Sequence, residues 1–190
     1  MEFPINAPPS LPTGRRGEEY STHSSGVIEN STSFPVRYNF LSSLRRPRSS
    51  SVTASRVYAA RSTDQGRSFT VPIEITRSPA TLDHSADTRP QLLVDRAGRV
   101  TVGYAVMTEV QFQGELFHAH SGDGGRSFSA PRPLSADPAG KRFLSLALDP
   151  DGAVFAAWID KRDLAAAKAA GRKYAGAAVY AAWSRDGGAS

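Results

Sequence analysis

Two stretches of the sequence share six of their eight residues: STDQGRSF at residues 62–69 and SGDGGRSF at residues 121–128. A third copy starts as SRDGG at residues 184–188. The shared pattern is S-x-D-x-G-x-S-F, and its aspartates are 59 and 63 positions apart. That distance is about the length of four short antiparallel strands with their loops, and a repeat at a nearly fixed period indicates one supersecondary unit used several times. The sequence therefore predicts a repeated, all-β architecture.

Each copy predicts a tight turn between two strands. An aspartate at this position can accept several backbone N–H groups at once, as in Asx turns. The glycine two positions later supplies a positive φ, which bulky residues resist, and the phenylalanine begins the next strand, where it can wedge into the core. We therefore expect a structural role, without substrate contact, for the residues that define the three copies. These are Ser62, Asp64, Gly66, Phe69, Ser121, Asp123, Gly125, Phe128, Ser184, Asp186 and Gly188.

A second, weaker repeat precedes two of the turns, as LVDRAGRV at residues 93–100 and ALDPDGAV at residues 147–154. Both alternating sets of positions in 153–159 (AVFAAWI) are apolar, which is typical of strands buried on both faces and favours sheets stacked face to face. The alanine-rich segment 163–174 favours a helix inserted between two strands. Short strands bounded by turn residues are expected at 56–62, 69–76, 90–95, 99–107, 116–121, 128–134, 143–149, 153–159 and 177–184.

The start of the chain differs in composition from the rest. Residues 1–50 contain ten serines and a single alanine, whereas alanine is frequent afterwards. This segment has scattered prolines and no sustained period of 2 or 3.6 residues, so it lacks the apolar surface that offsets chain entropy. The sequence predicts two parts: a disordered or foreign segment over residues 1–51 and a folded β region over residues 52–190.

The bulk composition narrows the class of partner. With 39% hydrophobic residues, 22% charged residues and a net charge of +5, the chain has the composition of a soluble globular protein that suits an anionic partner. The arginines are scattered, and the cluster of Arg45, Arg46 and Arg48 has no interleaved aromatic residues, so no nucleic-acid partner is expected. No apolar stretch approaches the roughly 20 residues of a membrane span, and the N-terminus does not resemble a signal peptide.

No cofactor or metal site is expected. The chain has no cysteine, which excludes thiolate ligands and leaves the redox compartment open. His118 and His120 share a strand face, but neither they nor His84 have a carboxylate at a spacing that completes a ligand set.

The octets at 62–69 and 121–128 resemble the Asp-box repeat of sialidases and related glycoside hydrolases. The run at 147–162, which ends in W-I-D-K-R, resembles the inner half of a blade in that family. The resemblance covers about residues 52–190 and implies a six-bladed β-propeller, with the Asp boxes joining the third and fourth strands of each blade, away from the active site.

Mapped on this sequence, the resemblance implies about two and a half blades. These are the outer half of one blade at 56–76, a full blade at 89–135 and three strands of the next at 143–184. Propellers avoid exposed edges by closing their ring. We therefore expect the chain to be a fragment of a longer protein, or to self-associate through its open sheet edges.

The resemblance also implies what an active site would contain. Family sialidases hold the substrate carboxylate with three arginines, whose guanidinium groups bind it in a two-pronged way, and use a tyrosine nucleophile with a glutamate and an acid/base aspartate. The nearest matches are Arg89, in R-P-Q-L at 89–92, and the pair Asp160 and Arg162 at the end of a strand. For these three residues the alternative to glycan binding is a structural role, as a salt bridge at the rim or as an anchor for a loop. Tyr104 and Tyr180 lie within expected strands and are expected in the core, so no catalytic residue is assigned.

Three functions remain open on the sequence. The chain could belong to an exo-sialidase or related glycosidase acting on terminal sialic acid or similar sugars, inactive in isolation because most catalytic residues lie in other blades. It could instead be a non-catalytic Asp-box propeller that binds glycan or protein, since a fold does not fix a function, or a truncated product without activity. By resemblance the partner is a glycan or glycoconjugate. The family is often secreted or periplasmic, but the compartment of this chain is left open.

Overall fold

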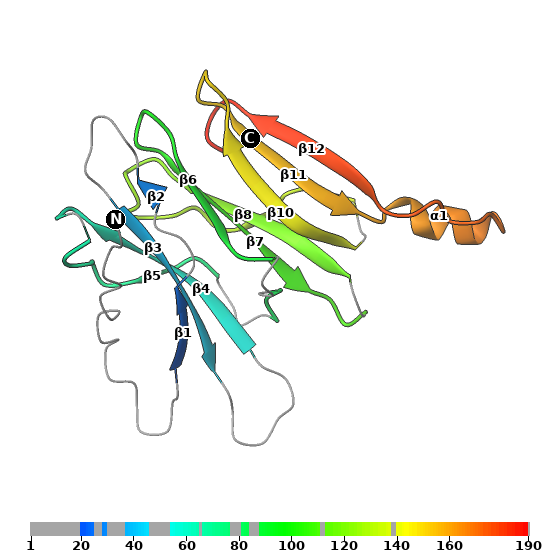
Figure 1. Ribbon diagram of the computed structural model, residues 1–190, viewed down its shortest axis with the longest axis horizontal. Coiled ribbons are helices and arrows are strands. Elements are labelled where there is room, and N and C mark those ends of the chain that lie inside the picture. The colour runs from blue at the N-terminus through cyan, green and yellow to red at the C-terminus, as the bar shows by residue number, and fades with distance from the viewer. Residues whose placement is uncertain are drawn as a thin grey trace, which may run out of the picture.

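The architecture is that of three stacked antiparallel β-sheets in a computed structural model (Figure 1). The structure describes residues 20–24, 28–29, 37–45, 54–64, 66–76, 81–83, 88–110, 113–137 and 140–189, with side chains from residue 56 onward. The expected all-β fold is confirmed for these residues, among which no closed barrel is formed.

The first sheet is built around a long central hairpin. It contains β1 (Tyr20–Ser24), β2 (Ile28–Glu29), β3 (Arg37–Arg45), β4 (Ala54–Ser62) and β5 (Ile73–Glu74). The strand order is β1-β3-β4-β5, and β2 also pairs with β3.

The second and third sheets repeat one another. The second has the order β6-β7-β8-β9, with β6 (Gln91–Val94), β7 (Val100–Met107), β8 (Gly114–Ser121) and β9 (Arg132–Pro133). The third contains β10 (Lys141–Leu148), β11 (Val154–Asp160) and β12 (Ala178–Ser184). The helix α1 (Asp163–Ala169) lies between β11 and β12 and projects beyond the end of the third sheet (Figure 1). It is shorter than the predicted 163–174.

The sequence predicts a disordered or foreign segment over residues 1–51, but the structure contains the strands β1, β2 and β3 there. Strand β3 pairs with β4 over nine positions, from Arg37 opposite Ser62 to Arg45 opposite Ala54. Main-chain hydrogen bonds along β4 can order such a segment without the strong hydrophobic alternation that sequence analysis looks for. The rest of residues 1–51 lies outside the described residues.

Two apolar layers join the three sheets. Between the first and second sheets, Val57 of β4 and Val100 and Val102 of β7 are completely buried, and burying each such side chain is worth about 1.5–3 kcal/mol. Between the second and third sheets, Leu116 packs with Trp158 in the other layer. The second sheet is therefore covered on both faces. The apolar strand 153–159, predicted to be buried on both faces, is covered on one face only: Ala156 and Trp158 of β11 are buried, whereas Phe155 is 40% exposed.

Gly103 on β7 permits the close approach of the second and third sheets. A Cβ at this position would lie 2.6 Å from Leu144 Cδ2 and 3.1 Å from Leu146 Cδ1, both on β10. A side chain at this position would require the terminal methyl group of Leu144 to shift, and larger residues would disturb the packing further.

Candidate functional site

The Asp-box turns share one hydrogen-bond pattern. In the first copy, Ser62 Oγ donates to Asp64 Oδ1 (2.7 Å) and accepts from Gly66 N (2.8 Å), while Ser68 donates its amide to Asp64 Oδ1 (2.9 Å) and its hydroxyl to Asp64 Oδ2 (2.5 Å). The side chain of one aspartate thus closes the hairpin from the inside.

The second and third copies repeat this pattern. Gly125 N donates to Ser121 Oγ at 2.8 Å, and Gly188 N donates to Ser184 Oγ at 2.8 Å. In the second copy Asp123 accepts the Ser127 amide (2.9 Å) and hydroxyl (2.6 Å). The hydrogen bonds account for the Ser, Asp and Gly positions of the motif without any ligand.

The turn also explains its glycines and phenylalanines. Gly66, Gly125 and Gly188 have φ values of 85°, 75° and 86°, in the region that side chains disfavour. Phe128 packs against the layer between the first and second sheets, as expected for the wedge. Phe69 is half-buried.

The hydrogen bonds make the turn aspartates stronger acids. Hydrogen bonds from the Ser68 hydroxyl and amide hold the pKa of Asp64 far below its ordinary value, and Ser127 does the same for the pKa of Asp123. A carboxylate that accepts several hydrogen bonds is stabilised in its charged form. These aspartates are therefore unsuited to donate a proton in catalysis near neutral pH.

A second turn recurs on the strand pair before each of the last two Asp boxes. Asp95 Oδ1 accepts the amides of Ala97 (2.9 Å) and Arg99 (2.8 Å), and Asp95 Oδ2 accepts from Arg99 Nε (2.5 Å). Asp149 accepts the amide of Ala153 at 2.7 Å in the same way. The weaker repeat seen in the sequence is thus a second aspartate-closed hairpin.

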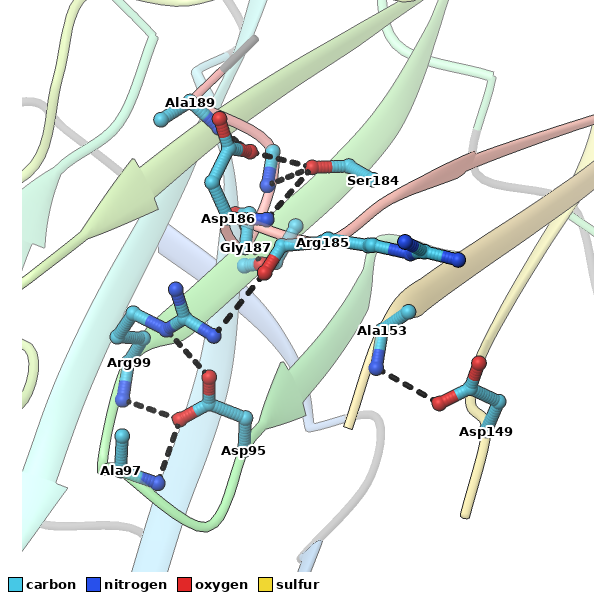
Figure 2. A network of polar contacts seen from close by, with 12 residues as sticks. Asp95, Ala97, Arg99, Asp149, Ala153, Ser184, Arg185, Asp186, Gly187 and Ala189 are labelled. Atoms are coloured by element: carbon cyan, nitrogen blue, oxygen red, sulfur yellow. Dashed lines mark hydrogen bonds and ion pairs between the residues drawn. The ribbon is translucent and has the colours of Figure 1, made fainter. Parts of the chain in front are cut away.

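The third Asp box docks on the second sheet (Figure 2). Thr101 Oγ1 on β7 donates to the Gly187 carbonyl at 2.7 Å, and Arg99 Nη2 lies 3.5 Å from the Arg185 carbonyl. A Cβ on Gly188 would lie 3.3 Å from His118 Nδ1. This turn therefore links the third sheet to the second.

The opposite end of the third sheet carries a polar network. Asp160, at the end of β11, has a fully buried side chain and accepts from Trp158 Nε1 (3.2 Å) and from the amide (2.8 Å), Nε (3.0 Å) and Nη2 (2.6 Å) of Arg162. Burial by itself raises the pKa of Asp160, but the hydrogen bonds from Arg162 and Trp158 outweigh it, so the pKa is lowered. The pair predicted from sequence is brought together as an ion pair between a buried aspartate and a partly exposed arginine.

The guanidinium of Arg162 has further partners. Its Nη1 lies 2.7 Å from Asp137 Oδ2, whose side chain is 48% exposed. Its Cζ lies 3.8 Å from the centre of the Tyr180 ring, a cation–π distance. The Tyr180 hydroxyl donates to Asp163 at 3.3 Å. Tyr180 is half-buried in this network, whereas Tyr104 is in the core as predicted.

A second ion pair, which sequence analysis missed, lies at the start of β10. Arg142 Nε and Nη2 donate to Asp83 Oδ2 (2.7 Å) and Oδ1 (3.2 Å) across 59 positions of sequence. The next residue, Phe143, has a φ of 59° within a β-bulge and leaves its side chain 38% exposed. A β-bulge changes the direction in which nearby side chains point. No local pattern in the sequence indicates this contact, because it depends on the stacking of two sheets.

Arg89 is exposed and stands outside the two ion-pair clusters. It directly precedes β6, between the buried residues Thr88 and Pro90. Burial of its neighbours fixes the backbone there, while the guanidinium is left in solvent.

Tyr104 is not placed to act as a catalytic tyrosine. Burial raises the pKa of Tyr104 to about 12, and its ring stacks on Phe117 with centroids 5.9 Å apart. A phenol held in that way resists ionisation and is poorly placed to attack a substrate.

The described residues contain no group of three or more histidine, cysteine, aspartate or glutamate side chains placed to hold a metal ion. No helix in the same part of the chain is long and apolar enough to span a membrane. Neither a protein-family model nor a curated protein matches the sequence.

Proposed function

We propose that the three sheets are blades of a sialidase-like propeller, part of a glycoside hydrolase acting on terminal sialic acid or related sugars. The repeated Asp-box hairpin, with its common hydrogen bonds and its docking on the neighbouring sheet, is the observation that carries the proposal. In this reading the 190-residue chain lacks most of the catalytic set and is inactive in isolation.

The end opposite the Asp boxes is the proposed glycan-facing end. It carries Arg89, Arg142 and Arg162, and sialic acid presents a carboxylate that guanidinium groups bind well. Arg89 is exposed, whereas Arg142 and Arg162 are paired with aspartates of the chain.

In this proposal Asp137 occupies the position on Arg162 that the sugar carboxylate takes when a glycan binds. It is the more exposed of the two carboxylates on Arg162, at 48% against 0% for Asp160. An exposed ion pair contributes little stability, so a ligand carboxylate can replace it at little cost. Asp160 then keeps the arginine in position.

A binding experiment tests this arrangement. Purified chain is titrated with sialyllactose and, as the neutral control, with lactose. We expect weak binding of sialyllactose alone, tighter in Asp137→Asn and weakened by at least about tenfold in Arg162→Gln, the loss of one charge-assisted hydrogen bond. Arg185→Gln removes the same charge at the Asp-box end and should have no effect. Equal affinities for the two sugars would contradict the proposal.

Turnover separates the enzyme from its alternative, a non-catalytic propeller that binds glycan or protein. The alternative is favoured by the internal pairing of Arg162 and the buried position of Tyr104. The isolated chain should release no 4-methylumbelliferone from its sialoside. Hydrolysis by a longer gene product containing this chain would support the enzyme, and glycan binding without hydrolysis would support the alternative.

A further inference from the structure

A cavity of about 250 Å³ lies between the second and third sheets, at the end that carries the Asp boxes. Its lining comes from both sheets and from Gly188 of the third Asp box. Six of the lining residues have counterparts elsewhere in the chain: His118, Leu134, Leu146, Val154, Ala156 and Ala182. An apolar cavity of about 150 Å³ can bind benzene, so this cavity has room for an aromatic ring.

The layer between the first and second sheets contains the counterparts of these six residues. The repeats align when Asp95 is matched with Asp149, and Ser121 with both Ser62 and Ser184. This alignment makes β7 equivalent to β11, and β8 equivalent to β12. In the order given above, the counterparts are Ala59, Ile75, Leu92, Val100, Val102 and Ala119.

The strand registers agree with the alignment. Val102 lies opposite Ala119 on the second sheet, as Ala156 lies opposite Ala182 on the third. The cavity therefore occupies the same place in its layer as the six counterparts occupy in the preceding layer.

In the preceding layer this place belongs to an aromatic ring. All six counterparts are members of the buried cluster between the first and second sheets, and Phe128 packs against that cluster. Five of the six positions are apolar in both layers, and the sixth is Ala59 in one and His118 in the other. The walls of the cavity are therefore those against which the repeat packs a phenyl ring.

The backbone that follows Phe128 pairs with β8. The Ser129 amide donates to the His120 carbonyl at 2.8 Å, and the Leu134 amide donates to the Leu116 carbonyl at 2.8 Å. Strand β12 is the equivalent of β8, and within the described part of the chain it pairs with β11 alone and forms an edge of the third sheet (Figure 1). An edge strand presents N–H and C=O groups to which an extended peptide can add.

We propose that the cavity and the adjoining edge of β12 form one binding site for an extended polypeptide segment that carries a phenylalanine. The segment adds a strand to β12, and its phenyl ring enters the cavity as Phe128 enters the preceding layer. By equivalence, the Trp183 carbonyl accepts the amide of the residue after the phenylalanine, and the Val179 carbonyl accepts an amide five positions later. The site does not depend on the proposed glycan function, whose residues lie at the opposite end of the sheets.

Calorimetric titration of the full chain with a peptide tests the site. The probe is RSFSAPRPL, the sequence of residues 126–134, acetylated and amidated at its ends. Peptide and chain both carry a net positive charge, so overall electrostatic attraction does not drive their association. We expect saturable binding that weakens at least about tenfold when the phenylalanine of the peptide is replaced by alanine, because burying this side chain is worth about a factor of ten or more in affinity.

Two alanines of β12 provide a matched pair of variants. Ala182 lines the cavity, whereas Ala181 is exposed, and successive side chains of a strand point to opposite faces. Ala182→Leu should weaken peptide binding at least about tenfold, because the larger side chain occupies the space of the phenyl ring. Ala181→Leu should leave the affinity within about twofold. Circular dichroism establishes that each variant is folded.

Methylation of peptide amides separates strand addition from insertion of the ring alone. N-methylation at the serine after the phenylalanine removes the donor to the Trp183 carbonyl and should weaken binding at least about fivefold. N-methylation at the following alanine, whose amide points away from β12 in an extended strand, should have little effect. Absence of saturable binding, equal binding of the alanine peptide, equal effects of the two β12 variants, or equal effects of the two methylations would each overturn the proposal.

Discussion

The second and third sheets are two versions of one repeat, and their differences separate structural from functional residues. Both keep the Asp-box serine, aspartate and glycine, and both keep the aspartate that closes the preceding hairpin. Both also keep an aromatic residue at the equivalent core position, Tyr104 in one and Trp158 in the other. What recurs is therefore what closes the turns and fills the layers.

The sheets differ at the end opposite the Asp boxes. Asp160 and Arg162 of the third sheet correspond to Val106 and Thr108 of the second. The repeat folds with either pair, so the ion pair is not required by the architecture. A charged network at one copy only is a better candidate for function than any residue that every copy shares.

The largest effect is expected from giving the third sheet the residues of the second. Asp160→Val alone should lower the free energy of unfolding by about 3 kcal/mol, because the Trp158 N–H loses its acceptor and Arg162 keeps only the exposed Asp137 as an anionic partner. Asp160→Val with Arg162→Thr should cost less, about 2 kcal/mol, because the guanidinium is removed together with its partner but the Trp158 N–H still lacks an acceptor. Urea unfolding measures both. Equal losses in the single and double variants would show that the pair is not coupled.

A smaller effect is expected from the hairpin aspartates. Asp95→Ala should lower the free energy of unfolding by about 2 kcal/mol, because the Ala97 and Arg99 amides lose a buried acceptor. Asp149 is exposed and its turn has alanine in place of Arg99, so Asp149→Ala should cost about 1 kcal/mol or less. Thermal unfolding of the two variants compares them directly, and a larger loss at Asp149 would contradict the role of burial.

The third test concerns a histidine that the third sheet replaces with alanine. Burial, with help from His120 and Arg132, lowers the pKa of His118. The unfolded chain then binds the proton more readily, so stability is full above the unfolded pKa of about 6.5 and falls as pH decreases through the lower folded value. His118→Ala, which introduces the residue at the equivalent position 181, should flatten this part of the stability–pH curve. An unchanged curve would assign the slope to another group.

The repeat was predictable from sequence because its information is local. Residues within eight positions make the Asp-box hydrogen bonds, so the turn chemistry and the strands on either side follow from the octet itself. The pairing of Asp160 with Arg162 was accessible for the same reason, being two residues apart.

The remaining features depend on distant parts of the chain. Arg142 contacts Asp83 only because the sheets stack. The positive φ of Phe143 arises in a β-bulge, and no glycine or other turn residue in the sequence indicates that bulge. Strand β3 is ordered through its pairing with β4. The covered face of β7 and β8 is less apolar than the open face of β11 and β12, so hydrophobic character in the sequence does not say which face is packed.

The smallest effect is expected within the Asp box. Ser127→Ala removes the hydroxyl that donates to Asp123 and should lower the free energy of unfolding by about 0.5 kcal/mol, because this hydrogen bond is exposed to water. The same hydroxyl is the main cause of the low pKa of Asp123. A carboxyl with a depressed folded pKa stabilises the fold above its unfolded pKa of about 3.9, and that contribution disappears as pH falls through the folded value. In Ser127→Ala the folded pKa moves toward the unfolded one, so less stability should remain to be lost on acidification. Acid titration followed by circular dichroism would therefore show a variant slightly weaker at pH 7, whose deficit narrows as the pH falls toward the folded pKa. A constant difference across this range would mean that the serine acts through packing and leaves the aspartate charge unaffected.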